Sequence, residues 1–140
     1  MEKKLKIVII GLGHWGKNFF RIVNDIENYF ELIAIVDSNN NALNNIGNSD
    51  LHAFGSIDEL LKSDIEFDAA IIATNTSSHY EMTKLLLLNN KHCLVEKPLT
   101  TSHEQAVDLY TLAEKNKLTL LVDHTFLYDE SILALIDSVL

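Results

Sequence analysis

The sequence has few cysteine and arginine residues, and each shortage excludes a class of protein. Its single cysteine, Cys93, cannot form an internal disulfide, which is typical of a protein from a reducing compartment. Arg21 is the single arginine, and 11 basic against 20 acidic residues give a net charge of −9. Proteins that bind nucleic acids through phosphate contacts usually carry the opposite charge, so we exclude nucleic acid as a partner.

The sequence also lacks long apolar runs. No run approaches the ~18–20 residues of a membrane-spanning helix, so we expect no membrane partner. The basic start and the apolar run at 5–10 resemble a signal peptide, but Gly11 ends this run before the ~7–15 apolar residues of an export signal. We therefore expect a first strand at 5–10 and a cytoplasmic protein. The length of 140 residues suits a single domain.

Apolar runs rich in β-branched residues alternate with amphipathic segments along the chain. These runs predict six strands, at 5–10, 32–36, 52–54, 69–73, 93–95 and 118–122. Apolar residues at helical spacing predict helices around Phe19, Leu86 and Leu109, and 39–45 is a weak helix or a loop. This alternation predicts an α/β fold with a doubly wound parallel sheet and three αβα layers.

Polar residues mark the expected helix ends. Ser56 with Glu59 and Ser78 with Glu81 match the capping box, which predicts a helix start at each place. The Asn89-Asn90 pair predicts the end of the second of these helices, since Asn tolerates the left-handed turn found there. A last helix is expected from residue 132, and the sequence stops inside it.

A glycine motif follows the first predicted strand and opens the first predicted helix. Residues 11–16 read G-x-G-x-x-G, and in this setting each glycine has a role in binding a dinucleotide. The first makes a tight turn, the second lets the backbone approach a pyrophosphate, and the third lets helix and strand pack closely. We expect cofactor contacts from Gly11, Gly13, His14, Trp15 and Gly16. The alternative is a plain glycine-rich turn.

An acidic residue ends the second predicted strand. Asp37 follows Gly16 by 21 residues, where a carboxylate can accept both hydroxyls of the adenosine ribose. The next four residues, 38–41, supply no cation for a 2′-phosphate. The pattern therefore favours NAD over NADP as the cofactor. The alternative is an aspartate that only caps a helix.

The segment Glu96-Lys97-Pro98, together with 73–79 and 90–95, resembles the Gfo/Idh/MocA family of oxidoreductases, which includes glucose–fructose oxidoreductase and inositol dehydrogenase. The resemblance covers essentially the whole chain but only the cofactor domain of that family. Two positions depart from its usual pattern: Asn75 stands where proline is common, and Asn90 where glycine is common.

The resemblance implies roles for the residues at these positions. Lys97 is similar to the active-site lysine, which hydrogen-bonds the reacting substrate oxygen, and Glu96 would lie near the nicotinamide ribose. Pro98 would fix the turn that presents the lysine. The cofactor cleft would be lined by Thr74, Asn75 and His79. From the residues alone, Lys97 could be an ordinary exposed lysine and His79 a residue that merely packs.

The resemblance also implies two domains with different roles. Residues 1–128 would form the dinucleotide-binding domain, and 129–140 would begin a connection to a C-terminal substrate domain that this sequence does not contain. The implied function is hydride transfer between NAD and a hydroxyl of a sugar, polyol or nucleotide sugar, with the 140-residue chain inactive alone. The alternative is a non-catalytic dinucleotide-binding or redox-sensing module that acts through a partner.

Apolar residues near the end of the sequence predict self-association. An exposed patch of this kind tends to find a partner, so we expect a homo-oligomer that involves Leu133, Leu135, Ile136, Val139 and Leu140. Cys93 is expected to be a buried apolar residue rather than a nucleophile. The histidines show no metal-ligand spacing, and we expect no metal site.

Overall fold

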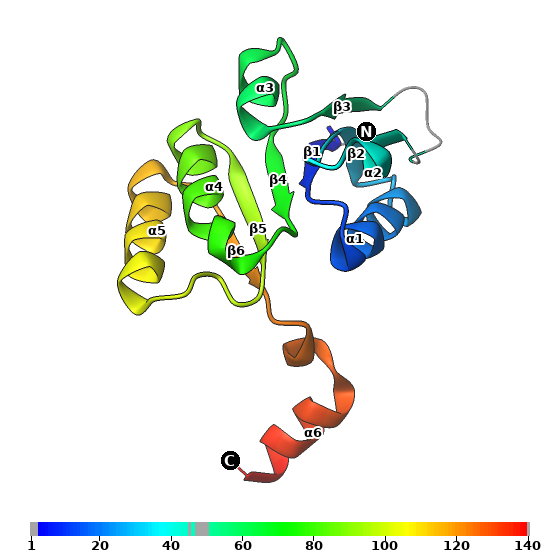
Figure 1. Cartoon of the computed structure of the whole chain (residues 1–140). Helices are drawn as coiled ribbons and strands as arrows, with labels where there is room; N and C mark the ends of the chain where they lie inside the picture. The colour runs from blue at the N-terminus through cyan, green and yellow to red at the C-terminus, as the bar shows by residue number, and fades with distance from the viewer. Residues whose placement is uncertain (1–2, 45, 47–50, 140) are drawn as a thin grey trace.

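A computed structural model describes residues 3–44, 46 and 51–139. Six parallel strands form one sheet in the order β3-β2-β1-β4-β5-β6 (Figure 1). The strands are Leu5–Ile10 (β1), Phe30–Val36 (β2), His52–Phe54 (β3), Ala69–Ile72 (β4), His92–Glu96 (β5) and Leu120–Asp123 (β6). The strand order reverses between β1 and β4, and open α/β sheets bind ligands at such a reversal, beyond the carboxyl ends of the strands.

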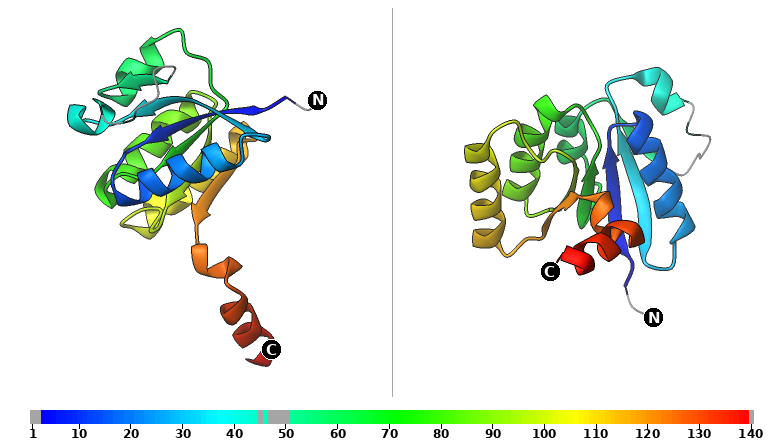
Figure 2. Two further views of the ribbon diagram at one scale, coloured as in Figure 1. Left: turned by 90° about the vertical axis from the view of Figure 1, so that its right-hand side faces the viewer. Right: turned by 90° about the horizontal axis from the view of Figure 1, so that it is seen from below.

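Helices cover both faces of the sheet and confirm the expected αβα layers. They are His14–Asp25 (α1), Asn40–Asn44 (α2), Ile57–Lys62 (α3), Thr76–Leu88 (α4), His103–Asn116 (α5) and Glu130–Val139 (α6). Strand β1 alternates between two apolar clusters. Val8 packs in a cluster with Leu86 and Leu109 from α4 and α5, whereas Ile9 packs with Phe19 from α1. Figure 2 shows α1 and the α4–α5 pair on opposite sides of the sheet.

Of the two capping boxes predicted from the sequence, one is confirmed and one is wrong. Ser56 caps α3, and its Oγ accepts a hydrogen bond from the amide of Glu59 at 3.3 Å, as the capping box predicts. The second capping box is wrong, because α4 begins at Thr76 after an extended Asn75. Ser78 therefore lies inside the first turn, and its Oγ donates to the carbonyl oxygen of Asn75 at 2.7 Å. Asn90 has a φ of +58°, the left-handed turn expected there.

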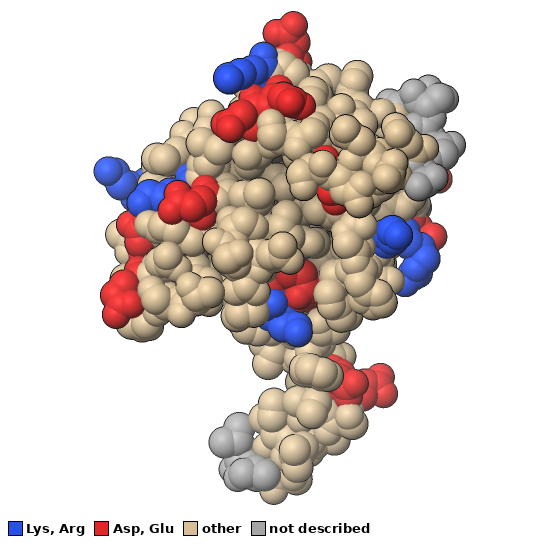
Figure 3. All heavy atoms as spheres, viewed as in Figure 1, with Lys and Arg blue, Asp and Glu red and all other residues tan. Residues whose placement is uncertain are grey.

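The C-terminal segment projects from the body of the molecule. After β6, a short 3₁₀ helix at Thr125–Tyr128 (η1) leads into α6, which extends away from the sheet (Figures 1 and 2). The visible surface of α6 is mostly uncharged apart from acidic side chains near its start (Figure 3). Within the described residues, no helix combines the length and apolar character needed to cross a membrane.

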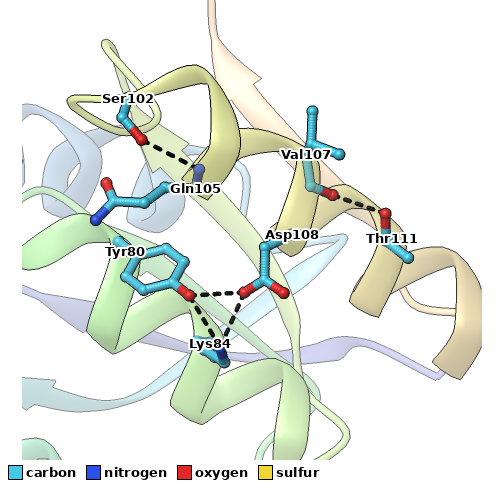
Figure 4. Close-up of polar contacts among 7 residues, drawn as sticks. All are labelled: Tyr80, Lys84, Ser102, Gln105, Val107, Asp108 and Thr111. Carbon is cyan, nitrogen blue, oxygen red and sulfur yellow. Dashed lines mark hydrogen bonds and ion pairs between the residues drawn. The ribbon is translucent and has the colours of Figure 1, made fainter.

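A polar contact joins the partly exposed faces of α4 and α5. The hydroxyl of Tyr80 donates to the carboxylate of Asp108 at 2.7 Å, and Lys84 Nζ lies 2.9 Å from both groups (Figure 4). The Tyr80 hydroxyl and the Asp108 carboxylate raise the pKa of Lys84, and the same contacts lower the pKa of Asp108. All three side chains reach the surface, so the contact aligns the two helices more than it stabilises the fold.

Candidate functional site

A cleft of about 600 Å³ opens at the carboxyl ends of β1, β2 and β4. It lies at the reversal of strand order, where an α/β sheet is expected to bind its ligand. The cleft is lined by seven of the residues predicted from the sequence: Gly11, Gly13, His14, Trp15, Asp37, Thr74 and Asn75. Sequence reasoning missed other lining residues, among them Ser56 at the cap of α3 and Met82 in the middle of α4, because neither belongs to a cofactor-binding motif.

The glycines of the loop meet different constraints. Gly11 has a φ of +94°, and a Cβ there would lie 2.7 Å from the carbonyl oxygen of Ala73. A Cβ on Gly16 would lie 1.8 Å from the carbonyl oxygen of Gly11, so packing of α1 against the loop requires glycine at that position. At Gly13, no described atom lies within 4 Å of the added Cβ. The protein itself therefore leaves Gly13 open to the cleft, as close approach of a pyrophosphate requires.

The start of α1 can attract an anion. Gly13 caps this helix without a side-chain hydrogen bond, and the first turn carries no acidic residue. The first amide groups of a helix lack partners within the helix and carry a partial positive charge. Trp15 stands beside them and is 43% exposed, with the ring of His14 packed edge-on against it at 5.7 Å. This end of α1 fits a phosphate group with an aromatic ring next to it.

Asp37 is fixed by two backbone amides at the end of β2. Its Oδ2 accepts a hydrogen bond from the amide of Leu12 at 2.6 Å, and its Oδ1 accepts one from the amide of Asn39 at 2.7 Å. The bond to Asn39 is a local turn contact, while the bond to Leu12 ties the carboxylate to the glycine loop. Each carboxylate oxygen has a second lone pair, so Asp37 can still accept the two hydroxyls of a ribose.

Glu96 and Lys97 lie at the end of β5, in a second group of residues outside the lining of the cleft. The carboxylate of Glu96 is buried and accepts a hydrogen bond from the amide of Lys97 at 2.9 Å. Glu96 pairs across the sheet with Asp123 at the end of β6. Burial raises the pKa of Glu96, and the nearby charge of Asp123 raises it further. The side chain of Lys97 is exposed, and the peptide bond to Pro98 is cis.

Asp123 is a neighbour of the predicted site residue Glu96 that sequence reasoning missed. The sequence held a clue: both strands were predicted, and each ends in an acidic residue, Glu96 in β5 and Asp123 in β6. Only the register of the two strands, with Glu96 opposite Asp123, brings the two carboxyl groups together.

His79 lies behind the cleft. Its side chain is only 1% exposed, so it does not form part of the lining. The Nδ1 atom lies 2.9 Å from the carbonyl oxygen of Pro98, and Nε2 lies 3.1 Å from that of Thr74. His79 therefore joins the loop that carries Lys97 to a wall of the cleft. Whether it also touches a bound cofactor stays a prediction, as do the contacts predicted for the other site residues.

Comparison with known proteins agrees with this geometry. The family model described as "Oxidoreductase family, NAD-binding Rossmann fold" matches residues 5–124. UDP-N-acetylglucosamine 3-dehydrogenase from Acidithiobacillus ferrooxidans is 32% identical over 117 residues, which are 83% of this chain and 36% of that protein. Biliverdin reductase A from Homo sapiens is 32% identical over 136 residues, 92% of this chain and 43% of that protein.

Solved structures share the fold at lower identity. The WlbA dehydrogenase from Bordetella pertussis, in complex with NADH and UDP-GlcNAcA, superimposes with a TM-score of 0.90 at 20% identity, over 98% of this chain and 42% of that one. A scyllo-inositol dehydrogenase from Lactobacillus casei with bound NAD(H) and scyllo-inositol gives a TM-score of 0.86 at 21% identity, over 97% of this chain and 42% of that one.

The chain thus spans less than half the length of each of these relatives. The matched part is the half that carries the glycine loop, Asp37 and the segment Glu96-Lys97-Pro98. The expected fold and the expected cofactor, NAD, are confirmed. The chain belongs to the Gfo/Idh/MocA oxidoreductase family and is its NAD-binding Rossmann domain.

Proposed function

We propose that this chain is the cofactor half of a dehydrogenase that moves a hydride between NAD and a hydroxyl-bearing carbon of a sugar, polyol or nucleotide sugar. The observation that carries the proposal is the cleft with an open Gly13 and a fixed Asp37, near an exposed Lys97 at a neighbouring strand end. Relatives named for UDP-N-acetylglucosamine and scyllo-inositol support this substrate class. The relatives named above are dehydrogenases or a reductase and lend no support to a non-catalytic module.

Different residues would bind different parts of the cofactor. The glycine loop and the start of α1 would hold the pyrophosphate, and Asp37 would accept the hydroxyls of the adenosine ribose. Thr74 and Asn75 would line the cofactor, and Glu96 would lie near the nicotinamide ribose. The carboxylate of Asp37 would repel a 2′-phosphate, and residues 38–41 offer no cation to offset it, so NAD is favoured over NADP.

Lys97 would contact the substrate directly. Bound NAD supplies the hydride acceptor, and the hydroxyl of the substrate must lose its proton as the hydride leaves. The exposed ammonium follows β5, the strand beside β4, and could hydrogen-bond that oxygen and stabilise the charge that develops on it while the proton passes to solvent. Most substrate contacts would come from the part of its relatives that these 140 residues do not span, so the 140 residues alone are expected to bind NAD without turnover.

We also propose a cellular location and an oligomeric state for the protein. We place it in the cytoplasm, on the single cysteine of the sequence. Cys93 is buried and unpaired, and burial raises the pKa of its thiol to about 12, so the thiol stays protonated and unreactive. We also propose a homo-oligomer, because α6 exposes Leu133, Leu135 and Ile136.

A titration followed by NMR tests the cofactor site residue by residue. Addition of NAD to the ¹⁵N-labelled chain should shift the amide signals of Gly13, Trp15 and Asp37, while that of Lys115, in the last turn of α5 and outside the lining of the cleft, stays in place. Shifts confined to residues outside the cleft would contradict the proposed site. A parallel assay with polyols and nucleotide sugars should produce no NADH, and turnover that Lys97→Ala abolishes would refute the expected inactivity.

A further inference from the structure

Two carboxyl groups lie side by side at the carboxyl ends of β5 and β6. The strand register sets Glu96 opposite Asp123, and a hydrogen bond between the two side chains contributes to the raised pKa of Glu96. Two ionised carboxylates have no hydrogen to share, so this bond requires one proton on the pair. Glu96 is only 5% exposed, whereas Asp123 is half-buried, so one member of the pair lies inside the protein and the other reaches solvent.

The elements around β5 add little other charge near Glu96. On one side, β4 carries only Ala and Ile, and on the other, His124 after β6 is exposed. On α4, His79 directs both ring nitrogens at backbone carbonyl oxygens. The other ionisable side chains of α4 reach the surface: Tyr80, Glu81 and Lys84. The ammonium of Lys97 favours the ionised form of Glu96, but burial and Asp123 outweigh it and keep the pKa of Glu96 raised.

The order of the strands directs the nicotinamide half of the cofactor toward this pair. Asp37 at the end of β2 would hold the adenosine ribose, and the start of α1, after β1, would hold the pyrophosphate. The rest of the cofactor then continues past β4 toward β5, because the strands follow one another as β2-β1-β4-β5. Neighbouring strands lie ~4.8 Å apart, so the ends of β2 and β5 are ~14 Å apart, a distance that an extended dinucleotide can span.

The two redox states of the cofactor differ in charge at the nicotinamide ring. Oxidised NAD (NAD⁺) carries a positive charge on that ring, and NADH carries none. A positive charge close to a carboxyl group favours its ionised form. We infer that binding of NAD⁺ expels the proton shared by Glu96 and Asp123, and that binding of NADH leaves this proton in place. The inference rests on the proposed function and deepens it, since it makes Asp123 a positioning residue that holds a proton on Glu96.

The pair would also give the proton of the reaction a place to go. The pair regains its affinity for a proton once the cofactor has accepted a hydride from the substrate carbon and has lost its positive charge. It can then take up the proton lost by the substrate hydroxyl, which Lys97 would hydrogen-bond, so that the alcohol becomes a carbonyl. From the pair, the half-buried Asp123 can pass this proton to solvent.

Calorimetry in paired buffers counts the protons released per bound nucleotide. The unaltered chain is titrated with NAD⁺ and with NADH in two buffers of different ionisation enthalpy, from the ordinary pKa of Glu, 4.5, up to about pH 8. Within this range we expect proton release with NAD⁺ and none with NADH. The affinity for NAD⁺ relative to NADH should rise with pH by about tenfold or more. NADH is the matched control ligand, because it differs from NAD⁺ at the nicotinamide ring alone.

Matched variants assign the released proton to the pair. Glu96→Gln keeps an oxygen that can accept from the amide of Lys97 but cannot ionise, so NAD⁺ should bind without releasing a proton. Asp123→Asn should move the release to lower pH, because Glu96 then ionises more easily. The control is Glu114→Gln, which removes one negative charge from an exposed position near the end of α5 and should leave the release unchanged.

The outcomes separate this inference from the proposed function. Binding of NAD⁺ without proton release at every pH, or equal release with NAD⁺ and NADH, would overturn the inference alone. Release that persists in Glu96→Gln would overturn it as well. The comparison of the two ligands needs no variant, so it decides the inference even if Glu96→Gln does not fold. Failure of both nucleotides to bind would refute the proposed function, and this inference with it.

Discussion

The Nδ1 atom of His79 lies 2.9 Å from the carbonyl oxygen of Pro98, 19 residues later in the sequence. On the other side of the same ring, Nε2 lies 3.1 Å from the carbonyl oxygen of Thr74. One buried ring in the first turns of α4 therefore joins two loops of the candidate site. Thr74 lines the cofactor cleft, and Pro98 follows the lysine that would contact the substrate. A change at His79 should disturb both loops together.

Replacement of His79 should measure this connection. His79→Phe keeps a ring of similar size but removes both nitrogen atoms, so the carbonyl oxygen that accepts from the ring N–H loses its donor in a part-buried site. We expect the free energy of unfolding to fall by about 2–4 kcal/mol. His79→Gln retains an amide donor and should recover part of the loss. Urea denaturation of the three proteins gives the comparison, and equal stability of the Phe and Gln variants would show that the ring matters only through its volume.

Gly13 before α1 and Gly16 inside it should respond differently to alanine. Gly16→Ala places a Cβ 1.8 Å from the carbonyl oxygen of Gly11, so α1 must shift and the fold should lose stability. Gly13→Ala meets no described atom within 4 Å, so the fold should be retained while NADH binding weakens. Thermal unfolding and calorimetric titration of both variants provide the test. A Gly13→Ala variant with unchanged affinity for NADH would mean that the pyrophosphate does not approach this position.

The raised pKa of Glu96 gives a pH dependence with a defined sign. Between its ordinary value of 4.5 and its raised value in the fold, the folded state binds more protons than the unfolded state, so Glu96 makes stability fall as pH rises through this window. Asp123→Asn removes a neighbouring negative charge and should bring the pKa of Glu96 down toward 4.5. Titration of the Glu96 carboxyl ¹³C signal measures this directly. An unchanged midpoint in the variant would mean that burial alone raises the pKa.

The parts of the site that the sequence predicted are the local ones. The glycine loop and Asp37 each follow a strand directly, at a fixed spacing in the sequence. This spacing was enough to predict that the loop and Asp37 lie at the same edge of the sheet. The six strands were predicted for the same reason, since each is a short apolar run between polar segments. The boundaries moved by one or two residues, as at β2, which begins at Phe30 rather than at residue 32.

The relationships that the sequence could not predict depend on distant segments. The bonds of His79 to Thr74 and Pro98 require α4 and β5 to be in place. The pairing of Glu96 with Asp123 depends on strand register, which apolar runs do not determine. Ser78 matched a capping box, yet the extended backbone at Asn75 starts the helix earlier and assigns the hydroxyl to a different bond. At Ser78 two local signals compete, and the helix start at Thr76 prevails over the capping box.

A calorimetric titration of the 140-residue chain with NADH, and in parallel with NADPH, tests the central claim most directly. We expect NADH to bind more tightly than NADPH. We also expect Asp37→Ala to weaken NADH binding by about tenfold or more, because hydrogen bonds to a charged carboxylate are lost. Asp37→Asn should bring the two affinities closer together, since it removes the charge that repels a 2′-phosphate. Binding of neither nucleotide, or equal binding of both by the unaltered chain, would contradict the assignment of the cleft to NAD.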